Sequence, residues 1–185
     1  MFIPGGWLLV ANLLMQSSTP PPGWTAETSY RGISNYDNSL MGLSTSAMNQ
    51  LRTHLSFTQL RFHCRKQQGR TFHVTTVADS SGEAVVQYFS GQTDVLPPSC
   101  GSFQRMDDDN SPMSLQCDRW GNDGSQYVGK WGHYNKKGEY RMYDHAAFVA
   151  NTYHWVLASG FWLCDEPGGN PFAMTSGDFW KIFVR

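Results

Sequence analysis

The sequence has little charge and no long hydrophobic run. Only 16% of its 185 residues are charged, and 14 basic residues oppose 15 acidic ones, for a formal net charge of −1. Proteins that bind nucleic acid or anionic membranes through a basic surface need an excess of Lys and Arg. We therefore expect no nucleic acid partner. The apolar run from Trp7 to Met15 is shorter than the about 20 residues that a membrane-spanning helix requires, so we expect no membrane span.

Catalytic motifs are missing as well. The chain contains no G-x-S-x-G elbow, no Walker loop and no G-x-G-x-x-G sequence, which are local signatures of hydrolases, nucleotide-binding proteins and dehydrogenases. Asp165 and Glu166 are adjacent. On a strand their carboxylates would point to opposite faces, which excludes a glycosidase pair made of these two residues. We expect a protein that is not an enzyme.

The histidines match no common zinc motif. None of the six belongs to H-x-x-x-H or H-E-x-x-H, the spacings that place two ligands on one helix face. His63 and His73 are expected on the polar face of a hairpin, where they approach each other across the strands. Because local spacing supplies no third and fourth ligand, we expect surface or hydrogen-bonded histidines there, and also at His54, His133, His145 and His154.

Four cysteines are present, Cys64, Cys100, Cys117 and Cys164, and none belongs to a C-x-x-C pair. This spacing argues against a zinc knuckle or a thioredoxin-like motif and predicts two disulfides, which form and persist outside the cytosol. Three pairings are available, and the sequence does not choose among them. We favour Cys100–Cys117, which closes a loop around an acidic turn, and Cys64–Cys164, which joins two distant strands.

Turn-forming residues are abundant. The chain has 18 glycines and 9 prolines spread along its length, which predicts many turns between short strands. We expect an α+β fold that is mainly antiparallel sheet, with one or two short helices, a long loop-rich and aromatic-rich segment, and stabilisation by disulfides. Residues 1–185 are expected to form a single domain.

Hydrophobic periodicity predicts the individual elements. A short amphipathic helix is expected over residues 44–54, where Ser44 is a capping residue before Ala47, Met48 and Leu51. The run from Trp7 to Met15 predicts an opening strand, and the competing interpretation is the apolar region of a signal peptide. The further expectations are a proline-rich loop at 19–23, a hairpin of strands 60–65 and 72–76, a central strand at 84–89, a second hairpin of strands 153–157 and 161–164 joined through Ser159-Gly160, and a last strand at 178–185.

An acidic turn offers candidate metal ligands. Asp107, Asp108, Asp109 and Asn110 are consecutive and precede Ser111-Pro112. Ca²⁺ takes six to eight oxygen ligands from carboxylates, amides, backbone carbonyls and water. The cluster therefore predicts a calcium site, and the alternative is a solvated acidic turn.

Aromatic residues on turn-rich segments offer a candidate ligand surface. Trp120, Trp131, His133 and Tyr134 follow the acidic turn, and exposed rings beside polar loop residues are typical of sugar or peptide recognition. The alternative is that these rings form the core of a segment with few strands.

Two sets of residues resemble a known family. The sequence Gly5-Gly6-Trp7-Leu8-Leu9-Val10 is similar to the opening strand of fibrinogen-related domains. A wider set, with the same cysteine order, resembles secreted coral proteins of the skeletal organic matrix that carry a fibrinogen-like carboxyl-terminal region. That set comprises residues 61–64, 69–74, 82–89, 99–103, 129–132 and 177–185. The chain departs from the fibrinogen pattern in one respect, because its acidic turn is followed by Cys117 alone and not by two cysteines bonded to each other.

The resemblance implies a function class. It implies a secreted, extracellular recognition or matrix module that binds glycan, matrix protein or a mineral surface, with calcium as the possible cofactor and the ligand pocket near the acidic turn. The alternative is a purely structural component of the extracellular matrix that has no specific small ligand.

Overall fold

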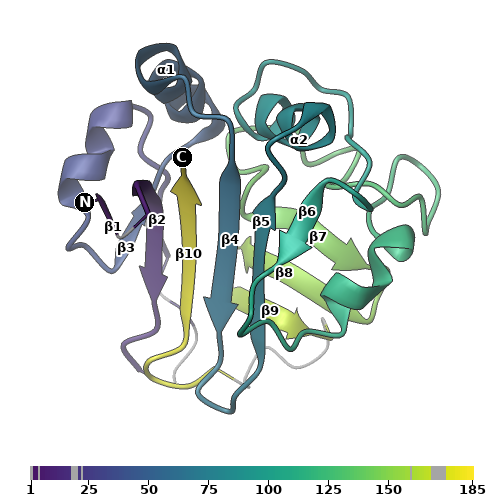
Figure 1. Ribbon diagram of the computed structural model, residues 1–185. Helices are drawn as coiled ribbons and strands as arrows, with labels where there is room; N and C mark the ends of the chain where they lie inside the picture. Colours follow the sequence, from purple (N-terminus) through teal and green to yellow (C-terminus); the bar gives the residue numbers. More distant parts are fainter. Residues whose placement is uncertain (1, 4, 18–20, 22, 159, 168–173) are drawn as a thin grey trace.

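Two antiparallel sheets and four short helical segments make up the part of the protein described by the computed structural model, residues 2–3, 5–17, 21, 23–158, 160–167 and 174–185. The larger sheet has the order β1-β2-β10-β4-β5-β6, with β3 also paired to β2, and the smaller has the order β7-β8-β9. Figure 1 shows the smaller sheet running across the back of the β4–β5 side of the larger one. The strands of the larger sheet are β1 (Phe2–Ile3), β2 (Trp7–Leu14), β3 (Leu40–Gly42), β4 (Leu60–Arg65), β5 (Thr71–Thr76), β6 (Phe103–Arg105) and β10 (Phe179–Val184).

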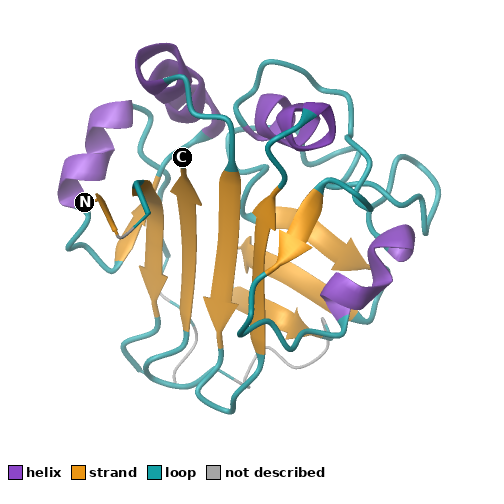
Figure 2. Ribbon diagram, viewed as in Figure 1, coloured by secondary structure: helices purple, strands orange, loops and turns teal. Residues whose placement is uncertain are grey.

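The smaller sheet and the helices complete the fold. The strands are β7 (Asp144–Val149), β8 (Tyr153–Ala158) and β9 (Phe161–Glu166). The helices are α1 (Thr45–Leu55) and α2 (Ser80–Phe89), with 3-10 turns η1 (Tyr30–Asn35) and η2 (Met113–Arg119). Figure 2 shows α1 and α2 together at one end of the larger sheet. The expected α+β, mainly antiparallel and disulfide-stabilised fold is confirmed.

The last strand lies in the middle of the larger sheet. β10 pairs with β2 on one side and with β4 on the other, both antiparallel. Segments from the two ends of the described chain therefore share backbone hydrogen bonds. The run that begins at Trp7 forms the predicted strand.

Large aromatic rings fill the space between the two sheets. Phe62 of β4 lies 5.3 Å from Trp155 of β8 and 5.4 Å from Trp131, measured between ring centroids. The main hydrophobic cluster includes buried residues of both sheets and of both α-helices. A second, smaller cluster on the outer side of the larger sheet consists of Trp7, Leu9, Met41 and Phe183.

Both favoured disulfides are present. Cys64–Cys164 joins β4 to β9 and so links the two sheets, while Cys100–Cys117 joins the segment before β6 to η2. The loop-entropy model assigns about 3 kcal/mol to a closure of the shorter kind. Two disulfides are consistent with an oxidising compartment.

The helix predicted over residues 44–54 is confirmed as α1. The Ser44 hydroxyl caps it by accepting a hydrogen bond from the Ala47 backbone N–H, and the helix ends at Ser56 in the left-handed conformation. Met48 and Leu51 face the core, as their spacing predicted.

The prediction of a central strand at residues 84–89 was wrong, because this segment belongs to α2. The Asp79 carboxylate caps the helix by accepting from the N–H groups of Ser81 and Gly82. Val85, Val86, Tyr88 and Phe89 are buried, and Gln87 is the one polar, exposed residue of the run. A short, mostly apolar segment of this kind resembles a central strand. The capping sequence that begins at Asp79 was the missed indication of a helix.

The remaining strand predictions agree with the structure. β4 and β5 form the first hairpin, β8 and β9 the second, and β10 the last strand. The first hairpin is buried on more than the one expected face, since Thr71, His73 and Thr75 are also covered. Ser159 and most of the loop predicted at 19–23 lie outside the described residues. Among the residues that are described, none of the helices has both the length and the apolar character to cross a membrane.

Candidate functional site

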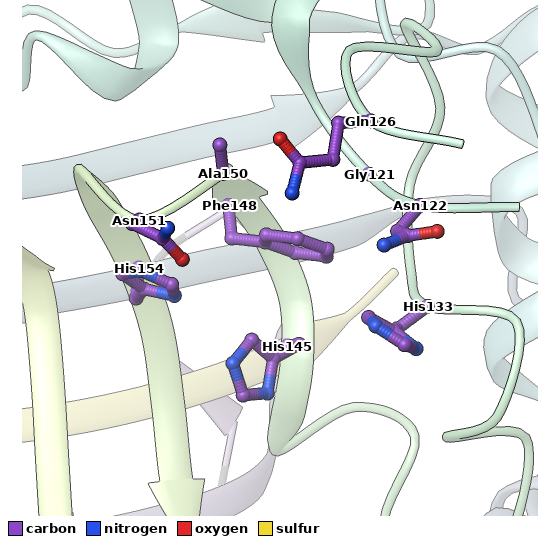
Figure 3. Close-up of a pocket in the computed structure, with 9 residues that line it drawn as sticks. All are labelled: Gly121, Asn122, Gln126, His133, His145, Phe148, Ala150, Asn151 and His154. Atoms are coloured by element: carbon purple, nitrogen blue, oxygen red, sulfur yellow. The ribbon is translucent and has the colours of Figure 1, made fainter. Parts of the chain in front are cut away.

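A small pocket rich in histidine lies beside the β7–β8 hairpin. Its volume is about 140 Å³, and we call it the histidine pocket. The lining residues come from β7, β8, the turn between them and the loop that follows η2 (Figure 3). They are Gly121, Asn122, Gln126, His133, His145, Phe148, Ala150, Asn151 and His154.

Phe148 is the centre of a set of contacting rings. It stacks on His154 at 5.9 Å and on His133 at 5.7 Å, and His145 meets its ring edge at 5.1 Å, all between centroids. Figure 3 shows the Phe148 side chain between His154 and His133. Tyr134 extends the stack from His133 and is exposed. The rings therefore form a rigid wall of mixed apolar and polar character.

An irregular strand positions the histidines. The pairing of β7 with β8 shifts register between Asp144 and Phe148. His145 and Ala150 adopt left-handed backbone conformations, with φ of +59° and +43°. Such conformations are costly for residues other than glycine and are often found at functional sites.

Burial keeps His133 and His154 neutral at pH 7. Desolvation, followed by the charge of His145, lowers the pKa of His154 to about 4. Desolvation also lowers the pKa of His133, and nearby His145 adds to the effect. Burial alone would raise the pKa of Asp144, but hydrogen bonds from His145 and Lys136 lower it. The Asp144 carboxylate, which lies next to the pocket and not in its lining, therefore stays ionised. Its Oδ1 is 2.6 Å from His145 Nδ1.

His154 is the least satisfied polar group of the pocket. The residue is 6% exposed, and both of its ring nitrogens are buried with no hydrogen-bond partner among the described residues. Buried polar atoms are nearly always paired, so an unpaired imidazole beside a cavity indicates a missing partner such as water or ligand. The nine lining residues include no carboxylate, serine, cysteine or lysine. Their amides, and the neutral imidazoles of His133 and His154, can donate and accept hydrogen bonds, which suits binding of an uncharged polar group.

A larger groove lies beside Asp144, the first residue of the same strand. It has a volume of about 310 Å³ and is lined by Trp24, Tyr140, Asp144, Leu157 and Ala158; we call it the aromatic groove. The Trp24 ring meets Tyr140 edge to face at 5.5 Å, and its indole N–H donates to the Leu157 carbonyl. Half-buried rings beside polar side chains are typical of carbohydrate and peptide sites.

Two of the four residues expected to bind a ligand are in the core. Trp120 and Trp131 are fully buried, so the prediction that their rings contact a ligand is corrected. The Trp120 indole N–H donates to the Met113 carbonyl and that of Trp131 to the Ser102 hydroxyl, which leaves neither donor free. His133 and Tyr134 lie at the histidine pocket.

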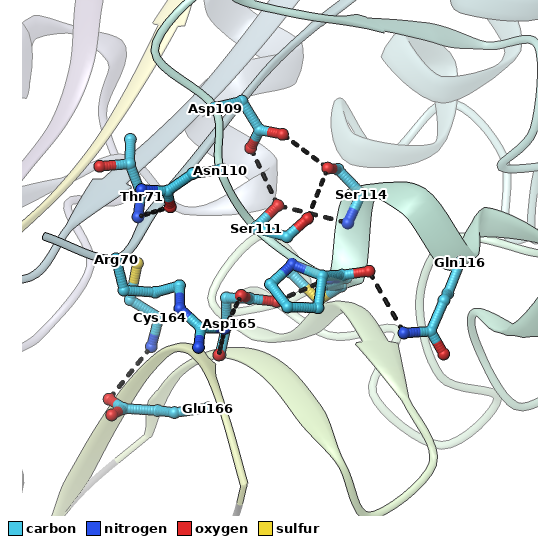
Figure 4. A network of polar contacts seen from close by, with 12 residues as sticks. Arg70, Thr71, Asp109, Asn110, Ser111, Ser114, Gln116, Cys164, Asp165 and Glu166 are labelled. Carbon is cyan, nitrogen blue, oxygen red and sulfur yellow. Dashed lines mark hydrogen bonds and ion pairs between the residues drawn. The ribbon is translucent and has the colours of Figure 1, made fainter.

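The acidic turn does not point its four side chains at one centre. Asp109 is buried, and its carboxylate accepts hydrogen bonds from the His73 N–H, Arg105 and the hydroxyls of Ser111 and Ser114. Figure 4 shows the bonds to the two serines.

The other three residues of the turn have separate positions. The Asn110 side chain accepts from the Thr71 N–H and donates to the Gly69 carbonyl, so it holds the turn against β5. Asp107 is exposed, and Asp108 faces two histidines. Asp109 and Asn110 therefore already have internal partners.

The carboxylates of Asp165 and Glu166 have different partners, as expected for adjacent strand residues. Asp165 accepts from Arg70 and from the Met113 N–H, and burial raises its pKa to about 6 despite these bonds (Figure 4). Glu166 pairs with the buried Lys66. Both carboxylates are occupied in holding β9 to its neighbours.

Sequence reasoning missed His145, His154 and Phe148 as members of one site. The two histidines are nine residues apart and meet only because β7 and β8 pair around residues 150–152. β7 was not predicted as a strand, so this hairpin could not be drawn. Comparison with protein-family models, with curated proteins and with solved structures gave no match.

Proposed function

We propose that this protein is an extracellular, non-enzymatic recognition module of the matrix, and that it binds a glycan at the histidine pocket. The single observation that carries the proposal is His154, a buried neutral imidazole with both nitrogens unpaired beside a cavity. A hydroxyl or amide group of a sugar would supply the missing partner.

The chemistry of the lining supports an uncharged ligand. Asn122, Gln126 and Asn151 provide amides, and burial lowers the pKa of His133 and His154 so that both are neutral at pH 7. A volume of about 140 Å³ suits one substituent or one small ring more than a larger ligand. The aromatic groove includes Asp144, the sequence neighbour of His145 in the histidine pocket. In this proposal the Trp24 and Tyr140 rings contact the further sugar residues of the glycan.

The extracellular part of the proposal rests on the disulfides and on the resemblance to fibrinogen-like matrix proteins. Two disulfides and no free cysteine among the described residues suit an oxidising environment. The partner is accordingly an extracellular glycan, or a matrix protein or mineral surface that carries one. Calcium assistance would use Asp107 and Asp108, the two exposed carboxylates of the turn, because Asp109 already has internal partners.

A glycan array with and without EDTA tests the proposal. The wild-type protein should show saturable binding that free sugar competes away. Loss of binding in EDTA that added Ca²⁺ restores and added Zn²⁺ does not would identify the calcium-assisted form. Asn151→Ala and Gln126→Ala remove exposed amides of the lining and should weaken binding at least about tenfold.

Gln104→Ala is the matched control, since Gln104 is an exposed glutamine of β6 outside the pocket lining. Its binding should equal that of wild type. If no sugar binds competably in either condition, the recognition proposal fails and a purely structural matrix component is the better account. The two disulfides and the dense aromatic core favour that second candidate.

A further inference from the structure

A second group of histidines lies on the outer face of the larger sheet. His63 of β4 and His73 of β5 are direct cross-strand neighbours. Their rings stack in parallel, with centroids 3.7 Å apart and an angle of 4° between the planes. Facing residues of adjacent strands have Cβ atoms about 5 Å apart, which brings two imidazoles within reach of one ion.

Asp108 of the acidic turn completes the group. One carboxylate oxygen is 2.5 Å from His73 Nδ1, and the other is 3.7 Å from His63 Nε2. One ligand atom from each residue lies within 4.8 Å of the others. Among the residues that the structure describes, no other set of three or more His, Cys, Asp and Glu has this proximity.

The two imidazoles have unused nitrogen atoms. The Nε2 atoms of both His63 and His73 are buried and lack a hydrogen-bond partner among the described residues. Burial, and then the charge of His73, lowers the pKa of His63 to about 3. Burial also lowers the pKa of His73, although Asp108 opposes this. His63 Nε2 is therefore free to coordinate an ion, and His73 Nε2 is free to carry the ring proton when His73 Nδ1 coordinates.

We propose that His63, His73 and Asp108 form a binding site for a divalent transition-metal ion, with Zn²⁺ as the test ion. Two imidazoles and one carboxylate suit zinc. Calcium prefers a shell made of oxygen atoms, so this set does not suit it. The site thus differs in chemistry from the calcium site expected of the same turn, and it is independent of the histidine pocket.

Binding requires small local movements. Zinc ligands lie about 2.0–2.2 Å from the ion in a tetrahedron, so the parallel rings must rotate until their lone pairs converge. The carboxylate must also move away from His73 Nδ1, and the proton on that ring then resides on Nε2. Asp108 is 54% exposed at its side chain and sits on a turn, so it can shift. Three protein ligands leave one position for water.

The charges around the site limit its affinity. Lys181 of β10 is opposite His63, and Arg61 is two residues away on β4; both act on His63 as positive charges. Asp109 beneath the turn acts on His73 as a negative charge, but its carboxylate is already paired with Arg105. We therefore expect micromolar binding, weaker than that of a closed structural zinc site.

Isothermal titration of the disulfide-intact protein with ZnCl₂ at pH 7.5 tests the proposal. The expected result is one equivalent of zinc and a melting temperature that rises with zinc concentration. Asp108→Asn should weaken binding at least about tenfold, as should His63→Gln. Because the Asp108 side chain is exposed, Asp108→Asn should fold even if the more buried His63→Gln variant does not.

Two matched controls separate this site from general cation binding. Asp107→Asn removes the neighbouring exposed carboxylate, and His54→Gln removes an exposed histidine on α1. Both should bind zinc as wild type does. Absence of zinc binding by the wild type, or unchanged binding by folded Asp108→Asn, would overturn the proposal. Equal loss in a control variant would do the same.

Discussion

Two groups of histidines lie at similar depth in the protein but have different surroundings. One group is His63 and His73 on the sheet face, and the other is His133, His145 and His154 in the histidine pocket. On the sheet face the rings are parallel and share one carboxylate, Asp108. In the pocket His145 alone contacts a carboxylate, through its Nδ1. The other two rings stack on Phe148.

This difference decides what each group can bind. A shared carboxylate makes the sheet-face group suitable for a cation. Amides and an apolar ring make the pocket suitable for an uncharged polar ligand. Residue type alone therefore does not assign a role to a histidine. Its neighbours across the strands do.

Removing Asp109 should have the largest effect and should affect only the sheet face. Its buried carboxylate accepts from the His73 N–H, Arg105 and Ser114. Asp109→Ala leaves these donors unpaired and should cost about 3 kcal/mol in the free energy of unfolding.

Urea denaturation and zinc titration check this result. Zinc binding should be lost with the turn, while glycan binding at the pocket should persist in the folded fraction. Asp107→Ala, at an exposed position of the same turn, should change stability by less than about 0.5 kcal/mol. A stable Asp109→Ala variant with normal zinc binding would show that the turn does not depend on this carboxylate.

Acid should destabilise the protein through the pocket. The folded pKa of His154, about 4, lies below its ordinary value of 6.5. Its contribution is therefore fully present above pH 6.5 and is lost as the pH falls through 4. The loss should reach up to about 3 kcal/mol. The nearby His145 opposes protonation of His154. Asp144 is the nearby anion, and it is paired with His145.

Urea melts between pH 4 and 8 measure this dependence. His154→Gln should flatten the profile over that range, whereas the exposed-histidine variant His54→Gln should keep the wild-type slope. An unchanged slope in His154→Gln would mean that His154 is not the group that titrates.

Asp165 should act in the opposite direction. Its folded pKa of about 6 is above the ordinary 3.8, mainly because of burial. The contribution of this group is present below pH 3.8 and is lost as the pH rises through 6, by up to about 3 kcal/mol. In Asp165→Asn the decline in the free energy of unfolding between pH 3.8 and 6 should vanish. The opposite change caused by His154 should then be easier to measure in the same urea denaturation experiments. A variant whose profile is superimposable on that of wild type would contradict the assignment.

Tyr134 should have the smallest effect on stability. Its ring is 49% exposed and stacks on His133 at the edge of the pocket. Tyr134→Ala should change the free energy of unfolding by less than about 0.5 kcal/mol and should weaken glycan binding severalfold. Tyr127→Ala, at a similarly exposed tyrosine, serves as the control. Equal weakening in both variants would argue against a role for the His133 stack.

The sequence predicted the fold better than the site. Alternation at Leu60, Phe62 and Cys64 identified β4, and capping at Ser44 identified α1, because these patterns are local. The segment at 84–89 was misread because five of its six residues are apolar and Gln87 alone interrupts the run. The polar face of the helix becomes visible only when residues 80–83 are included. The cysteine pairing was a preference that local patterns could not establish.

The sites depend on contacts that local patterns do not contain. The approach of His63 to His73 followed from the predicted hairpin, and the structure places the two rings together. The addition of Asp108 depends on how a turn 35 residues further along the chain folds back over β5. Trp120 and Trp131 were predicted to contact a ligand because they lie on turn-rich segments. Their burial in the core between the two sheets depends on tertiary packing, which local patterns do not show.

The different chemistry of the two histidine groups is tested most directly by long-range ¹H–¹⁵N NMR of the six imidazoles during addition of ZnCl₂. The signals of His63 and His73 should shift or exchange with saturation at one equivalent, while those of His133, His145, His154 and His54 stay in place. A response of the pocket histidines at the same zinc concentration, with His63 and His73 unchanged, would contradict the account.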